Sequence, residues 1–215
     1  MKRLAPLLLL PLLLAGCQGL GTVAPASTAS APEPPSSPQR LPFPEPAAPA
    51  VSLDEKLLYD YLVGEIGARM GDLEKALPAY LEAARRAKDP YAAERATRIA
   101  WHLGRIDAAA QAAALWVQRA PNSLAARQFL GLARLRQGRE KDALMQFRAL
   151  LAIARARGKD GLLQVAGALA REPDKDRALA LMRRLVAEAG GGPRARYALA
   201  VLLVAQDRSA EAERL

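Results

Sequence analysis

Residues able to do catalytic or metal chemistry are scarce in this chain. It has one cysteine, Cys17, and one histidine, His102. A zinc site needs several Cys or His ligands, and a nucleophilic side chain needs a histidine held beside it, so these two residues do not supply either kind of site. No GxSxG turn is present, and the triple glycine before Pro193 lacks the Lys-Ser/Thr that ends a phosphate-binding loop. The composition therefore argues against an enzyme and predicts neither a metal nor a cofactor.

Basic side chains, by contrast, recur at a regular spacing. Arg69, His102, Arg136 and Arg171 follow one another at intervals of 33, 34 and 35 residues, and Ala205 takes the fifth position. We call these four basic residues the basic column. If the chain repeats, each lies one repeat from the next, and together they could hold an acidic segment or a chain-terminal carboxylate. The alternative is that each only offsets the dipole at a helix C-terminus and stays solvated.

The basic column would be positioned by a turn that lies two residues further along the chain in each repeat. Gly71, Gly104, Gly138, Pro173 and Asp207 follow one another at intervals of 33 to 35 residues. The flanking apolar residues have the spacing of two short antiparallel helices, with the glycine in the turn between them. Neither helix of such a hairpin can bury its apolar stripe alone, so the repeats must stack on one another.

Small and bulky residues at fixed offsets indicate how the helices of each hairpin cross. Five residues after the turn position stands an alanine in all repeats: Ala76, Ala109, Ala143, Ala178 and Ala212. Four residues later a bulkier side chain follows in three repeats, namely Tyr80, Phe147 and Met182, with Ala113 as the exception. The period and these preferences resemble the tetratricopeptide repeat, a helix-turn-helix unit of 34 residues. The resemblance implies an all-α fold, a tetratricopeptide-repeat solenoid of stacked helical hairpins, with about 4.5 repeats over residues 52–215.

In this repeat family the first helix of each hairpin lines an inner, concave surface, which becomes the candidate partner-binding face. Besides the basic column, it would carry Tyr61, Glu65, Tyr91, Glu94, Arg98, Trp101 and Gln128. Trp101 and Trp116 are interpreted as packing residues rather than as anchors for a partner.

Local signals place the hairpins in order. Ser52, with Glu55 three residues later, predicts the N-cap of the first helix. The connections that follow are predicted at Asp89-Pro90, Pro121-Asn122-Ser123, Gly158-Lys159-Asp160-Gly161 and Gly190-Gly191-Gly192-Pro193. The fifth repeat stops inside its second helix at Leu215, without a polar capping helix, so we expect a longer array or an end that pairs with another molecule.

The N-terminal segment has the pattern of an export signal. Lys2 and Arg3 precede an apolar run over residues 4–15, shorter than the roughly 20 residues that cross a bilayer. The following Leu14-Ala15-Gly16-Cys17 resembles the lipobox of bacterial lipoproteins, which implies a signal peptide over residues 1–16 and lipidation of the Cys17 thiol. By the same resemblance, Gln18 in place of Asp favours an outer-membrane anchor with the chain facing the periplasm.

Residues 17–51 join this anchor to the repeats and are rich in Pro, Ala and Ser. Proline removes amide donors and fixes φ, so the segment is predicted to be a disordered, extended tether.

The chain carries 31 basic and 22 acidic residues, a formal charge of +9 that suits an anionic partner. Export argues against nucleic acid as that partner.

A closer resemblance covers residues 71–105, GDLEKALPAYLEAARRAKDPYAAERATRIAWHLGR. Together with the lipobox and the tether, this segment is similar to the N-terminal part of proteobacterial outer-membrane lipoproteins with many tetratricopeptide repeats. One such protein is an adaptor that brings cell-wall hydrolases to a periplasmic carboxy-terminal processing protease. The resemblance implies a lipid-anchored scaffold or adaptor whose partners are proteins or peptides, such as a periplasmic protease and its substrates.

Two other functions remain open. The chain could be a lipoprotein that assists assembly of an envelope machine, such as a pilus secretin or the machinery for outer-membrane proteins. It could also be the accessory region of a cell-wall enzyme.

Overall fold

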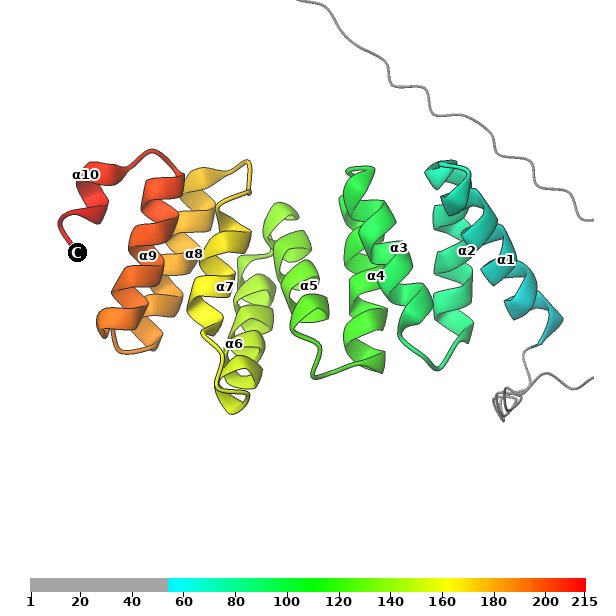
Figure 1. Ribbon diagram of the computed structural model, residues 1–215, viewed down its shortest axis with the longest axis horizontal. Helices are drawn as coiled ribbons and strands as arrows, with labels where there is room; N and C mark the ends of the chain where they lie inside the picture. Colours follow the sequence, from blue (N-terminus) through cyan, green and yellow to red (C-terminus); the bar gives the residue numbers. More distant parts are fainter. Residues whose placement is uncertain (1–53) are drawn as a thin grey trace, which may run out of the picture. The chain divides into compact units, whose positions relative to one another are not determined.

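The computed structural model describes residues 54–215, which form ten α-helices and no strand in that range. The helices are α1 (Glu55–Arg69), α2 (Leu73–Arg86), α3 (Tyr91–His102), α4 (Ile106–Arg119), α5 (Leu124–Arg136), α6 (Glu140–Ala156), α7 (Gly161–Leu169), α8 (Lys175–Glu188), α9 (Pro193–Ala205) and α10 (Ser209–Ala212). They pair as hairpins that stack side by side in chain order (Figure 1). The predicted all-α fold of stacked tetratricopeptide-type hairpins is confirmed. The predicted signal peptide, Cys17 and tether lie outside the described residues.

The turns within four of the five hairpins lie where the sequence predicts them. Gly71, Gly104 and Gly138 have φ angles of 79°, 69° and 73°, and Asp207 has 64°. In this left-handed conformation the helix ends and the next amide can bond back to the last turn. For example, the Arg139 amide donates to the Arg134 carbonyl at 2.9 Å.

The fourth hairpin turns differently because proline cannot adopt a positive φ. Helix α7 has only nine residues and ends at Leu169, well before Pro173. The chain then reverses through residues 170–174, and this longer connection places the side chain of Glu172 in the interior.

Inside the hairpins, glycines on the first helix face large rings on the second. A β carbon on Gly64 would lie 3.0 Å from the Tyr80 ring, and one on Gly131 would lie 2.9 Å from the Phe147 ring. Both rings are fully buried. In the second hairpin the sizes are exchanged: the first-helix position holds Thr97, and the second-helix position holds Ala113. Ala113, the exception in the sequence pattern, therefore has a bulkier residue at the matching position of the first helix.

The capping residue of α1 differs from the sequence prediction. Asp54, not Ser52, is the N-cap, and its Oδ1 accepts from the Leu57 amide at 2.6 Å. Either residue has the right side chain, but only Asp54 stands three residues before a free amide of a helix that starts at Glu55. At α3, Asp89 accepts from the Tyr91 amide at 2.9 Å, while Pro90 takes the N-cap position rather than the first turn.

Two clusters of buried apolar side chains form the interior. The first, between α2 and α5, consists mainly of alanines, such as Ala83, Ala96 and Ala100. The second, between α5 and α9, is rich in leucine, such as Leu150, Leu169 and Leu202. The partly buried Trp101 packs against both clusters, so this residue joins the two halves of the array.

Candidate partner-binding face

Side-chain contacts join the first helices of successive hairpins and place α1, α3, α5 and α7 along one face. Tyr61 on α1 donates to Asp89, just before α3, at 3.1 Å. Gln164 on α7 donates to Gln128 on α5 at 3.0 Å. We call the side of these four helices that carries such contacts the inner face. Tyr61, Glu65 and Tyr91 lie close together at its α1–α3 end, and Gln128 lies further along, in contact with α7.

The α1–α3 end of the inner face is organised around one carboxylate. Glu65 accepts a hydrogen bond from the Tyr80 hydroxyl at 2.6 Å and another from the Tyr91 hydroxyl at 2.5 Å. The Arg95 guanidinium donates to the Tyr80 oxygen at 3.3 Å and lies 3.9 Å from Glu65. Neither Tyr80 nor Arg95 is among the candidates that the sequence predicts. The repeat pattern indicates only the packing role of the Tyr80 ring, although a buried tyrosine needs a partner for its hydroxyl.

These contacts fix the protonation states in the cluster. The hydrogen bond from Tyr80, and after it the one from Tyr91, lowers the pKa of the Glu65 carboxyl. Burial, and after it the hydrogen bond to Glu65, raises the pKa of Tyr80 to about 12. The hydrogen bond to Glu65 also raises the pKa of Tyr91. Around neutral pH the cluster therefore holds one carboxylate and two neutral phenols.

Next to this cluster, Tyr61 lies with its ring centroid 6.2 Å from that of Tyr91. Burial, with the charge of Asp89 as the next cause, raises the pKa of Tyr61. The phenol therefore stays a donor, and it links α1 to the start of α3.

Aromatic rings occupy the middle of the inner face. Trp101 and Phe129 meet edge to face with centroids 5.6 Å apart. The Arg98 guanidinium lies 5.6 Å from the Phe129 ring and 5.7 Å from the Trp116 ring, and pairs with Glu94 at 2.7 Å. Trp101 and Trp116 thus pack within the array, and Arg98 covers part of this packing.

One member of the basic column is occupied by contacts within the chain. The Arg136 guanidinium lies 4.1 Å from the Trp101 ring centroid. It also donates two hydrogen bonds to the buried Glu172 carboxylate, at 2.8 and 3.1 Å. The expectation that Arg136 offers free donors to a partner is corrected by this contact. Sequence alone did not predict it, because Glu172 reaches this position only through the longer fourth turn.

The other three members of the basic column, Arg69, His102 and Arg171, are exposed. Within residues 54–215 their side chains form no ion pair. At the turn end of each hairpin they remain available to an anionic group. No three His, Cys, Asp or Glu side chains gather as a metal site in this described part.

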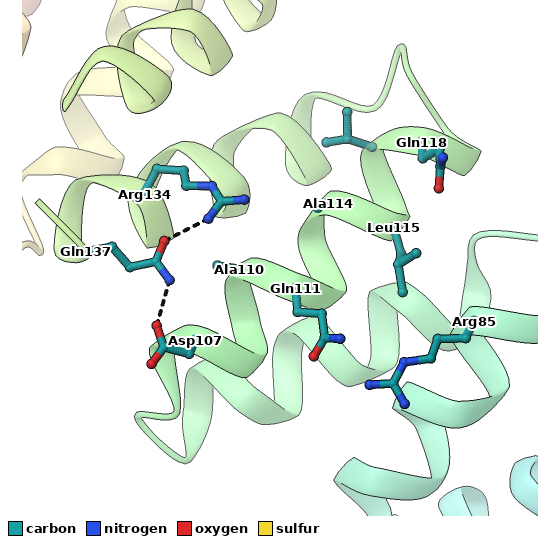
Figure 2. A pocket seen from close by; sticks show the side chains of 10 residues that line it. Arg85, Asp107, Ala110, Gln111, Ala114, Leu115, Gln118, Arg134 and Gln137 are labelled. Carbon is teal, nitrogen blue, oxygen red and sulfur yellow. Dashed lines mark hydrogen bonds between the residues drawn. The ribbon is translucent and has the colours of Figure 1, made fainter. Parts of the chain in front are cut away.

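Away from the inner face, a groove of about 620 Å³ lies between α2, α4 and α5 (Figure 2). Gln137 on its wall donates to Asp107 at 2.7 Å and accepts from Arg134 at 2.9 Å. Arg85 lies on the opposite wall, and the floor between holds small and amide side chains such as Ala114. None of these residues was a sequence candidate.

A second cavity, of about 770 Å³, is bordered by residues of α6, α8 and α9 and by the α6–α7 connection. Arg148 on its wall donates two hydrogen bonds to Glu188, at 2.8 and 2.5 Å.

Among the helices of the described region, none combines the length and apolar character needed to cross a bilayer.

Comparison with known proteins agrees with the repeat fold. No protein-family model matches the chain. The TPR repeat-containing protein PA4667 of Pseudomonas aeruginosa is 31% identical over 145 residues, which cover 67% of this chain and 24% of that protein. The chain thus spans about a quarter of that relative's length.

Among solved structures, a MamA protein shares 16% identity with a TM-score of 0.48, covering 74% of this chain and 87% of its own. A tetratricopeptide repeat protein from Parabacteroides merdae shares 19% identity with a TM-score of 0.46, covering 74% of this chain and 62% of its own. These likenesses concern the type of repeat alone.

Proposed function

We propose that this chain is a scaffold that binds proteins or peptides along its inner face and has no catalytic activity of its own. Stacked repeats of this kind are typical of protein-binding scaffolds. The observation that carries the proposal is the alignment of α1, α3, α5 and α7 along one face, with Arg69 and His102 exposed one repeat apart and Arg171 exposed two repeats beyond His102. Extended acidic segments or chain-terminal carboxylates fit such spaced cations.

The finer proposal is a lipid-anchored adaptor in the periplasm. It is supported by the lipobox-like sequence ending at Cys17, by the proline-rich segment after it, and by the resemblance of residues 71–105 to outer-membrane lipoproteins with tetratricopeptide repeats. In this proposal the anchor holds the repeats at the outer membrane, and the inner face presents substrates to a periplasmic protease.

The first test measures binding with charge-reversed variants of the full chain. A photo-crosslinking residue at Tyr91 identifies the bound protein in the native cell, and a titration with that protein then gives the affinities. We expect Arg69→Glu and Arg171→Glu each to weaken binding on the order of tenfold, equal to about 1.4 kcal/mol. Arg184→Glu, an exposed position on α8, is the control and should change binding little. Equal losses at all three positions would contradict binding along the inner face.

The identity of the crosslinked protein tests the finer proposal. A periplasmic protease or its cell-wall hydrolase substrates would support the adaptor. Secretin or outer-membrane-assembly components would instead support the alternative in which the chain assists assembly of an envelope machine.

A further inference from the structure

The outermost surface of α1 is apolar and exposed. Leu58, Leu62, Ile66 and Met70 follow one another every four residues and are 48%, 51%, 55% and 79% exposed. Residues at this spacing lie on one side of a helix. Tyr59, 62% exposed, borders them. We call these five residues the α1 stripe.

Two positions of this register are buried in the next two hairpins. The positions of Tyr59 and Ile66 correspond to Ala92 and Ile99 on α3, and to Ala126 and Ala133 on α5. All four of these residues are buried where α3 packs on α2 and α5 packs on α4. At Tyr59 and Ile66 the α1 stripe therefore matches a surface that packs inside the array in the following hairpins, whereas the positions of Leu58 and Leu62 hold the exposed Tyr91 and the half-buried Arg95 on α3.

The charges at the two ends of the stripe indicate what covers it. Glu55 in the first turn and Arg69 in the last turn of α1 are both exposed. Two antiparallel copies of α1 centred on Leu62 would place Glu55 beside the partner subunit's Arg69, and Leu58 beside the partner subunit's Ile66. A parallel arrangement would instead bring like charges together at each end. The surface is thus self-complementary about a two-fold axis.

The segment that precedes α1 is less suited than a second copy of the chain to supply a helix that packs on the α1 stripe. Residues 21–50 are rich in proline, which lacks the amide donor that a helix interior needs. We propose that a second copy of this chain covers the α1 stripe, giving a two-fold symmetric dimer through antiparallel α1 helices. Arg69 belongs both to the basic column and to this dimer surface, so dimerisation is judged by the charge-exchange pair with Glu55 and by variants of Leu62, which is not a candidate for partner binding.

Charge exchange tests the pairing of opposite ends. The full chain is kept in detergent, and its monomer–dimer equilibrium is measured by analytical ultracentrifugation. We expect Glu55→Arg alone and Arg69→Glu alone each to weaken the dimer several-fold. The double variant should restore dimerisation, because the two charges exchange places across the two-fold axis. Lys141→Glu on α6 is the matched control and should leave the equilibrium unchanged.

Cysteine crosslinking tests the orientation. In a full chain with Cys17→Ser, Leu62→Cys should form a disulfide-linked dimer. A mixture of Leu58→Cys and Ile66→Cys chains should link to each other more efficiently than either links to itself. A chain that stays monomeric, crosslinks that indicate a parallel pair, or a dimer unaffected by Leu62→Asp would each overturn the proposal. Circular dichroism of the Leu62→Asp chain checks that the helices remain folded.

Discussion

The two halves of the array are held together by different kinds of contact. The core between α2 and α5 is made mainly of alanines, whereas the core between α5 and α9 is made mainly of leucines with Phe147 and Met182. Each buried methylene contributes roughly 0.8 kcal/mol, so a leucine core gains far more from burial than an alanine core of similar extent. The N-terminal half compensates with close helix approach and with polar contacts on its inner face, notably those of Glu65.

This contrast shows where each half tolerates change. A leucine-rich core loses stability when a side chain is shortened, because a cavity remains. An alanine-rich core has little to lose by shortening, but it has no room for a larger side chain.

The largest expected effect is in the C-terminal core. Leu169→Ala removes a fully buried side chain from α7 and should lower the free energy of unfolding by about 2–5 kcal/mol. Leu163→Ala, on the same helix but 37% exposed, is the matched control and should cost much less. Urea denaturation measures both. Similar losses in the two variants would mean that the leucine core does not dominate the stability of this half.

An intermediate effect is expected from enlarging the alanine core. Ala100→Leu inserts a larger side chain into a fully buried position on α3 and should destabilise the fold by about 1–3 kcal/mol. Ala114→Leu on α4 is the control in the same half, because the groove in Figure 2 offers room for the added atoms. Thermal unfolding of both variants gives the comparison. If Ala100→Leu is as stable as the control, the packing in this half is looser than the structure shows.

The smallest effect concerns the polar cluster of the N-terminal half. The pKa of Glu65 is lowered in the folded chain, so its contribution to stability is fully present above the ordinary carboxyl pKa of 4.5 and is lost as the pH falls through the lowered value. The pKa of Tyr80 is raised to about 12, so its contribution is complete below its ordinary value of 10.0 and is lost as the pH rises through 12.

Glu65→Gln should remove the acid-side part of this dependence while leaving the C-terminal half unaffected. Amide hydrogen exchange of α1–α3 and of α7–α9, followed from neutral to acid pH, separates the two halves. An identical pH profile for Glu65→Gln and the unmodified chain would show that the cluster contributes nothing to the stability of α1–α3.

The sequence was sufficient to predict features that depend on residues close together along the chain. Gly71, Gly104 and Gly138 specify the turns because left-handed backbone favours glycine, and the register of Tyr80 and Phe147 follows from the same period. The sequence also predicts that Tyr61 and Glu65 share one side of α1, because residues four apart lie on the same side of a helix.

Contacts between repeats were not predictable in the same way. The pairing of Arg136 with Glu172 depends on the length of the connection between α7 and α8 around Pro173, which the repeat period alone does not predict. The role of the Tyr80 hydroxyl was missed because its ring fits the packing pattern, and only the structure shows that Glu65 lies at its tip. The α1 stripe could not be recognised from sequence either, since the repeat period does not indicate which apolar residues of α1 stay exposed.

Trp101 has a consequence for how the array behaves as a unit. Its indole packs against both cores and lies under Arg136, so neither half can loosen without exposing this ring to water. Nearest-neighbour contacts normally let a repeat array fray from its ends one hairpin at a time. Here Trp101, together with helix α5, which supplies residues to both cores, couples melting of the two halves, and in a Trp116→Phe chain the indole fluorescence of Trp101 would report when that cooperativity is broken.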